Sequence, residues 1–189
     1  MIVVCMLSLA SGSIVAHAAV LKAIPTSTSY AVGDTVRVKV AVSSDTQSIN
    51  GAAATITYPT DLLSLSSISK TGSIMTLWAQ EPTFSNATGT AKFEAIALNG
   101  FTGTNGTVVT LVFKAKKAGT ASVEVTSGSV LANNGEGTNV LNARESARVI
   151  IGPAKATAAP SQTITETPVV PTTTTHTLSV EEVPKADEF

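Results

Sequence analysis

Hydrophobic and polar residues alternate along most of the chain, from residue 20 to residue 151. In the segment GDTVRVKVAV, valine occupies every second position from 36 to 42, and polar or small residues fill the positions between. This period of two is typical of a β-strand with one buried face and one solvent-facing side. The pattern predicts strands at 36–42, 52–58, 62–68, 74–79, 89–98, 106–116, 121–132 and 139–151, with a break in the seventh at Gly128.

Short segments rich in glycine and asparagine separate these predicted strands. Asn99-Gly100 and Ala118-Gly119 are two of them, and such residues favour tight turns. No stretch of the predicted domain shows the longer period of an amphipathic helix. Many short strands joined by turns indicate an all-β sandwich or jelly roll.

The first 18 residues differ in character from the alternating region. Residues 1–10 are mostly apolar, and Ala16-His17-Ala18 has the small-residue pattern of a signal-peptidase site. We therefore interpret residues 1–18 as a secretory signal peptide and expect an extracellular, secreted or cell-surface protein. An N-terminal membrane anchor is the alternative, which the short apolar run disfavours. No membrane span is expected in the mature chain.

The composition changes again after Gly152. Residues 153–189 are rich in threonine and proline, which is typical of a linker or a disordered tail. Residues 19–152 are thus the predicted domain, with 10 basic and 8 acidic side chains. Such a balanced charge argues against nucleic acid as a partner, because phosphate recognition needs clustered lysine and arginine.

The predicted domain lacks the residues that most catalytic and metal sites require. His17, His176 and Cys5 are the only histidines and the only cysteine of the chain, and all three lie outside residues 19–152. Their positions exclude serine–histidine and cysteine–histidine catalysis and ordinary zinc sites in the domain. A carboxylate pair for glycoside hydrolysis stays formally open. We expect a non-enzyme without cofactor or metal.

The order of several motifs resembles the cohesin family over nearly all of residues 19–151. A Gly-Asp pair precedes a hydrophobic strand, a tyrosine–proline segment leads to a leucine, and a strand that begins with glycine ends at phenylalanine before a glycine turn. In this chain the motifs are Gly33-Asp34, Tyr58 to Leu62, Gly106 to Phe113, Gly119 and Asn134-Gly135. No single motif is specific, and the resemblance rests on their order and spacing.

The resemblance implies a nine-stranded jelly-roll β-sandwich with a non-catalytic role. Cohesins bind dockerin modules of other secreted proteins, which are typically polysaccharide-degrading enzymes. The implied partner is therefore a dockerin-like module, and the implied setting is an extracellular polysaccharide-related assembly. The recognition face would include the outward positions of the strand before Tyr58, which are small in this chain: Gly51, Ala53, Thr55 and Thr57.

Trp78 is the only tryptophan of the chain, and two interpretations of it stay open. It can fill the core of a domain built mainly of valine and alanine, which needs some large side chains. It can also stack on a sugar, with Phe84 as a second contact, which would make the domain a carbohydrate-binding module that recognises polysaccharide. A third possibility for the whole domain is a structural cell-surface or adhesin module.

Overall fold

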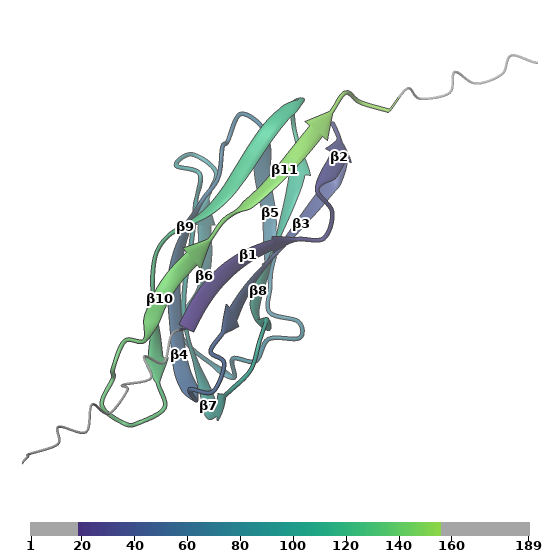
Figure 1. Cartoon of the computed structure of the whole chain (residues 1–189). Helices are drawn as coiled ribbons and strands as arrows, with labels where there is room; N and C mark the ends of the chain where they lie inside the picture. Colours follow the sequence, from purple (N-terminus) through teal and green to yellow (C-terminus); the bar gives the residue numbers. More distant parts are fainter. Residues whose placement is uncertain (1–18, 156–189) are drawn as a thin grey trace, which may run out of the picture. The chain divides into compact units, whose positions relative to one another are not determined.

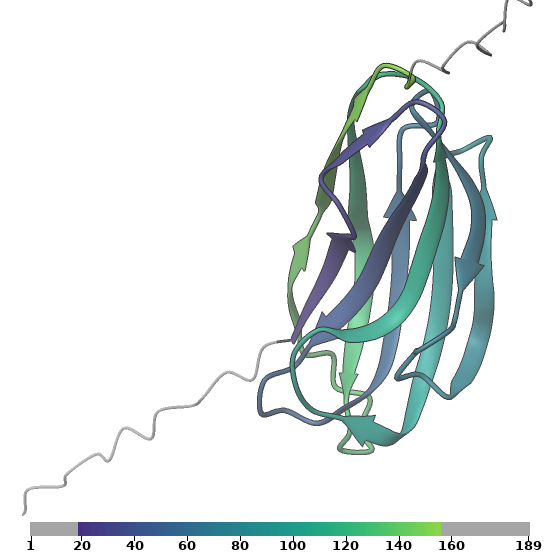
Figure 2. The same ribbon diagram turned by 90° about the vertical axis from the view of Figure 1, so that its right-hand side faces the viewer.

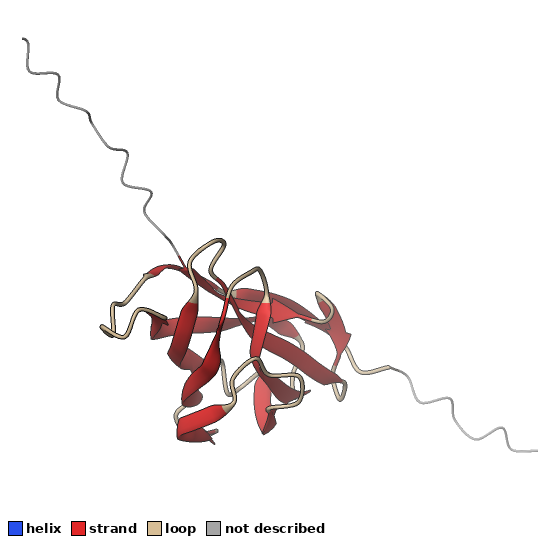
Figure 3. Ribbon diagram, turned by 90° about the horizontal axis from the view of Figure 1, so that it is seen from below, coloured by secondary structure: helices blue, strands red, loops and turns tan. Residues whose placement is uncertain are grey.

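The computed structural model describes residues 19–155, which form strands, turns and loops without a helix (Figure 3). The expected signal peptide and nearly all of the expected tail lie outside the described residues. The eleven strands are β1 Ala19–Pro25, β2 Ser29–Ala31, β3 Thr35–Ser43, β4 Ile49–Thr57, β5 Leu63–Ser69, β6 Leu77–Ser85, β7 Thr90–Phe101, β8 Gly106–Ala115, β9 Gly119–Ala132, β10 Leu141–Glu145 and β11 Ala147–Gly152.

The strands build two sheets that face each other, as Figures 1 and 2 show. A five-stranded sheet has the order β10-β1-β3-β8-β5, and a six-stranded sheet has the order β2-β11-β9-β4-β7-β6. Most neighbours are antiparallel, but β1 pairs with β10 and β2 pairs with β11 in parallel. The fold is the expected all-β sandwich.

The core lies between the two sheets and consists of the residues that alternate inward. In β3, Val36, Val38 and Val40 are completely buried, while Arg37 between them is exposed. Phe93 of β7 and Phe113 of β8 supply the large inward side chains. Alanine is frequent in this core, so the few aromatic rings fill much of its volume.

The structure corrects several of the strand assignments made from the sequence. The chain has eleven strands, whereas the alternation predicts eight and the resemblance implies nine. Strands β1 and β2 precede the first predicted strand, and segment 139–151 divides at Ser146 into β10 and β11, which belong to different sheets. The strand expected at 74–79 begins at Leu77 and continues through Pro82 to Ser85. Strand β9 is not broken at Gly128, and this residue pairs with Ala54 inside the sheet.

Asn86 joins the two sheets where β5 and β6 form their edges. It lies in the turn between β6 and β7, and its Oδ1 accepts a hydrogen bond from the Leu65 amide at 2.8 Å. Its Nδ2 donates to the Leu65 carbonyl at 2.9 Å, and the Tyr58 hydroxyl donates to Oδ1 at 3.0 Å. One side chain therefore takes the place of a neighbouring strand at this point of the β5 edge.

The Tyr58 hydroxyl donates one of these three hydrogen bonds, and burial raises its pKa. Because the pKa in the folded protein lies above the unfolded value of about 10, the folded state retains the proton more strongly. The protonated Tyr58 hydroxyl therefore contributes its full stabilisation at pH values below about 10. This contribution is lost as the pH rises through the higher pKa of the folded protein.

Replacing Asn86 with alanine should lower the free energy of unfolding by about 2 kcal/mol, because the peptide groups of Leu65 lose their partners at a partly buried site. Urea denaturation of both proteins measures the difference. Asn142→Ala is the matched control, since Asn142 is exposed and no hydrogen bond of its side chain occurs within residues 19–155. The control should stay within about 0.5 kcal/mol of the wild type. If the Asn86→Ala protein were as stable as the wild type, the connection between the two sheets at Leu65 would not depend on this side chain.

Candidate functional site

The outer face of the six-stranded sheet contains the positions that the sequence suggested for partner binding. Strand β4 runs through the middle of this face, between β9 and β7, and β6 forms the edge beyond β7. Ala52, Ala54 and Ile56 of β4 point into the core and are buried. The positions between them consequently face outward, as the pleat of a strand requires.

The outward positions of β4 form the floor of a shallow trough, which we call the β4 trough. Its floor is Gly51, Ala53, Thr55 and Thr57, and each of these pairs with a residue of β9 on one side and of β7 on the other. Longer side chains of β7 flank the floor on one side. On the other side β9 contributes large side chains only at the two ends, Leu131 and Glu124, with the small Ser129 and Ser127 between them. A depression of about 370 Å³ lies over Ala53 and Thr55.

The middle of the trough is polar. Ala53 lies between Ser129 of β9 and Glu94 of β7, and the next row along the strands places Thr55 between Ser127 and Lys92. Gln80 of β6 pairs with Glu94 and extends the row to the sheet edge. Lys92 and Glu94 are both exposed, so their charges are available to a partner.

One end of the trough is apolar. A row across the sheet runs from Leu131 of β9 over Gly51 to Ile96 of β7 and Leu77 of β6. A Cβ atom added at Gly51 would lie 3.2 Å from Leu131 Cδ1, so this leucine covers the glycine, which is buried. Leu77 is 49% exposed, and Leu98, two residues beyond Ile96, is 67% exposed.

These apolar side chains were not among the predicted site residues. The sequence did place Ile96 and Leu98 opposite the inward alanines of 89–98, and this was the signal for an exposed apolar group. Leu77 and Leu131 gave no comparable signal, because their place beside Ile96 depends on the register of three strands.

Trp78 and Phe84 lie on the edge strand β6 and not in the trough. The Trp78 ring packs edge to face on buried Phe93, with 6.3 Å between the ring centroids. Lys70 Nζ lies 5.3 Å from the Trp78 ring centroid and forms an ion pair with Glu81 at 2.7 Å. Trp78 is half-buried against the core, whereas Phe84 is 41% exposed.

The two rings do not form one stacking platform. Trp78 and Phe84 pair with Ala95 and Ala91 of β7, which are four residues apart because β6 bulges twice between them, and this corresponds to roughly 13 Å of extended strand. Adjacent sugar units would need rings that lie close together and share a plane. The geometry favours a packing role for Trp78, and its contact with a ligand stays a prediction.

Metal-binding clusters and membrane-spanning helices are both absent from the described residues. Residues 19–155 contain no group of three or more histidine, cysteine or acidic side chains that could hold a metal ion. Within the same residues, no helix is long and apolar enough to cross a membrane. The β4 trough itself presents small side chains, hydroxyl groups, charged side chains and an apolar end to a ligand.

Comparison with solved structures finds cohesins. The chain is similar to the cohesin of the Coh-OlpC-Doc435 complex, a type I cohesin–dockerin complex from Clostridium thermocellum, with 12% identity, a TM-score of 0.61 and coverage of 72% of this chain and 95% of that one. It is similar to the sixth cohesin of Acetivibrio cellulolyticus scaffoldin B, solved with Cel5 dockerin, with 21% identity, a TM-score of 0.58 and coverage of 71% and 99%. A non-cellulosomal cohesin from the archaeon Archaeoglobus fulgidus gives 15% identity, a TM-score of 0.58 and coverage of 71% and 91%.

The sequence itself points to the same family. A search of curated protein sequences found no significant match. The family described as "Cohesin domain", however, matches residues 21–149, which is more than half of the chain. This chain belongs to the cohesin domain family.

Proposed function

We propose that this domain is a non-catalytic binding module that docks a dockerin-type protein module in the β4 trough. The observation that carries the proposal is the continuous run of small side chains on the central strand, Gly51, Ala53, Thr55 and Thr57, which is flanked by longer side chains of β7 and, at its two ends, of β9. Two similar structures are described as cohesin–dockerin complexes, which supports a partner of this kind.

The width of the trough suits an α-helix. Neighbouring strands lie about 4.8 Å apart, so the two flanking strands β9 and β7 are separated by roughly 10 Å. A helix with its side chains is about 10–12 Å across. Small floor residues allow the ridge of such a helix to approach the sheet closely, as large residues on β4 would not.

The distribution of side chains along the trough suggests how a partner is held. The apolar end, with Leu77, Ile96, Leu98 and Leu131, can bury surface, and buried apolar anchors dominate the energy of most interfaces. Lys92 and Glu94 in the middle are opposite charges, so the site does not select for a strongly charged partner. They can fix the register of the partner through hydrogen bonds and charge pairs.

Filling the trough tests the proposal. Ala53→Arg places a long charged side chain on the floor and should weaken binding by about 100-fold or more, since lost burial and an unpaired charge together exceed about 2.7 kcal/mol. An array of immobilised dockerin modules identifies a binder, and titration calorimetry with that dockerin gives the dissociation constants. Ser67→Arg, on an exposed position of β5 in the other sheet, is the control that should bind normally.

Two results would contradict the proposal. The first is a folded domain that binds no dockerin of the array. The second is a folded Ala53→Arg protein that binds as tightly as the Ser67→Arg control. Circular dichroism of both variants shows whether the sandwich is retained.

We also propose that the protein is exported and acts in an extracellular polysaccharide-related assembly. The support is the pattern of residues 1–18, which is typical of a secretory signal peptide, together with the membership in the cohesin family. Mass spectrometry of the protein from the culture medium should find an N-terminus at Ala19. Recovery of the chain only inside cells, with Met1 retained, would refute export.

A further inference from the structure

The outer face of the five-stranded sheet, on the other side of the sandwich from the β4 trough, carries a band of positive charge. Lys114 of β8 pairs with Thr35 of β3, which places it diagonal to Arg37. Lys39 follows two residues after Arg37 on the same side of β3, and Lys22 of β1 lies diagonal to Lys39 because it pairs with Ala41. Diagonal and next-but-one neighbours of a sheet are about 7–8 Å apart. We call Lys22, Arg37, Lys39 and Lys114 the cation band.

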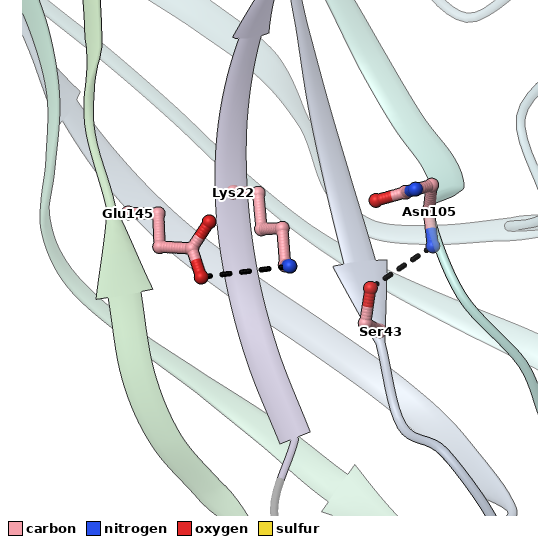
Figure 4. Close-up of polar contacts among 4 residues, drawn as sticks. All are labelled: Lys22, Ser43, Asn105 and Glu145. Carbon is pink, nitrogen blue, oxygen red and sulfur yellow. Dashed lines mark hydrogen bonds and ion pairs between the residues drawn. The ribbon is translucent and has the colours of Figure 1, made fainter.

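The strands of this sheet carry few carboxylates. Glu145 of β10 is the one carboxylate among the strand residues that face outward on this sheet, and it lies 3.5 Å from Lys22 Nζ (Figure 4). Arg37, Lys39 and Lys114 form no ion pair with any residue between 19 and 155. The outer face of the six-stranded sheet differs, because Lys92 and Arg148 there are balanced by Glu94 and Glu124.

A shallow depression adjoins the band at its centre. Its lining consists of Ile24, Pro25, Thr26, Lys39 and Thr110, and its volume is about 340 Å³. Ile24 and Pro25 give it an apolar wall, and the Lys39 ammonium and the Thr110 hydroxyl add a cation and a hydrogen-bonding group. The combination suits a ring that has an apolar face, hydroxyl groups and a carboxylate.

Hydroxyl side chains continue beside the band toward the β5 edge. Ser69 pairs with Thr110, Ser67 with Val112 and Ser64 with Lys114. Outward strand residues of this sheet include no aromatic ring, which argues against the base stacking on which single-stranded nucleic acid binding relies. Serine and threonine hydroxyls can instead form hydrogen bonds with sugar hydroxyls.

We propose that the cation band and the depression at Lys39 form a second binding surface, and that it takes an extended polysaccharide bearing carboxylate groups, a uronate-containing glycan. Lys39, Arg37 and Lys114 bind successive carboxylates, and the depression holds one sugar ring against Ile24 and Pro25. Because this surface and the β4 trough lie on opposite sheets, one domain can hold the glycan and a protein partner together. The two proposals stand or fail separately.

Binding of the full chain to polygalacturonate tests this surface. Titration calorimetry should detect binding to polygalacturonate and none to dextran, a neutral glycan. Raising the salt to about 1 M, where the screening length is about 3 Å, should weaken the binding. Arg37→Ser combined with Lys39→Ser should weaken it roughly tenfold or more, which corresponds to about 1.4 kcal/mol. Lys92→Ser combined with Arg148→Ser removes the same charge from the other sheet and should leave it unchanged.

Poly-L-glutamate separates a sugar site from general attraction to a polyanion. It carries carboxylates without sugar rings, and we expect it to bind clearly more weakly than polygalacturonate. Equal binding of the two polymers would overturn the proposal, as would no binding of polygalacturonate to the folded chain. The same loss in both double variants would also overturn it, because the binding would then follow net charge and not this surface.

Discussion

Replacing Gly128 with alanine should lower the free energy of unfolding by about 3 kcal/mol, the upper part of the range for overpacking a sheet interior. A Cβ atom at this position would lie 2.6 Å from the Ala53 carbonyl oxygen and 2.9 Å from Leu21 Cδ1. The first of these is backbone of the neighbouring strand β4, which cannot turn away as a side chain can. The second belongs to a completely buried leucine of the opposite sheet. Strands β9 and β4 would have to separate locally.

Gly152→Ala is the matched control for this change. A Cβ atom there meets only the Tyr30 carbonyl oxygen at 3.7 Å, an ordinary contact. Its effect should stay within about 0.5 kcal/mol. Urea denaturation of the two variants and the wild type measures both values. If the two alanine variants proved equally stable, the close approach at Gly128 would be relieved without cost, and the glycine would have no packing role.

Gly128 also shows what alternation along a strand cannot predict. Glycine inside a strand pattern suggests either a break or a close approach of another group. The choice depends on what lies opposite, and Ala53 and Leu21 are far from Gly128 in the sequence. The alternation predicts a break at Gly128, whereas the structure shows the close approach within a continuous strand.

The division of segment 139–151 has a similar cause. Most odd-numbered residues of this segment are apolar on both sides of Ser146, with Glu145 as an exception, and the sequence therefore indicates one strand. Yet Glu145 pairs with outward Lys22 on one sheet, whereas Val149 is buried in the other. The chain crosses from one sheet to the other at Ser146, so the odd-numbered Glu145 faces outward and the odd-numbered Val149 faces inward. Periodicity indicates which residues share a face and not which sheet the face belongs to.

The candidate site in the β4 trough could likewise be predicted only in part from the sequence. Alternation placed Ala52, Ala54 and Ile56 inward, which is confirmed, and so the outward set of β4 followed. The apolar end of the trough did not follow, because Leu131, Gly51 and Ile96 meet only through the pairing of β9, β4 and β7. The cation band depends on pairing in the same way. Alternation in the sequence predicts which residues of a single strand face outward. A surface that several strands share can be predicted only when the register of their pairing is known.

Replacing Trp78 with alanine should lower the free energy of unfolding by about 3 kcal/mol, near the lower end for a large aromatic side chain because this one is only half-buried. The loss includes the edge-to-face contact with Phe93 and the packing that covers the core between the edge strands. Phe84→Ala, on the same strand and exposed, should lose less than about 1 kcal/mol.

Thermal or urea denaturation distinguishes the two variants, and titration of each folded variant with neutral soluble polysaccharides tests the other interpretation of the tryptophan. A Trp78→Ala protein with wild-type stability and a lost affinity for such a polysaccharide would make the ring a ligand contact. The opposite result is a Trp78→Ala protein of low stability, together with a wild type that binds no neutral glycan. It would identify Trp78 as part of the core, because the ring then has a structural partner in Phe93 and no ligand.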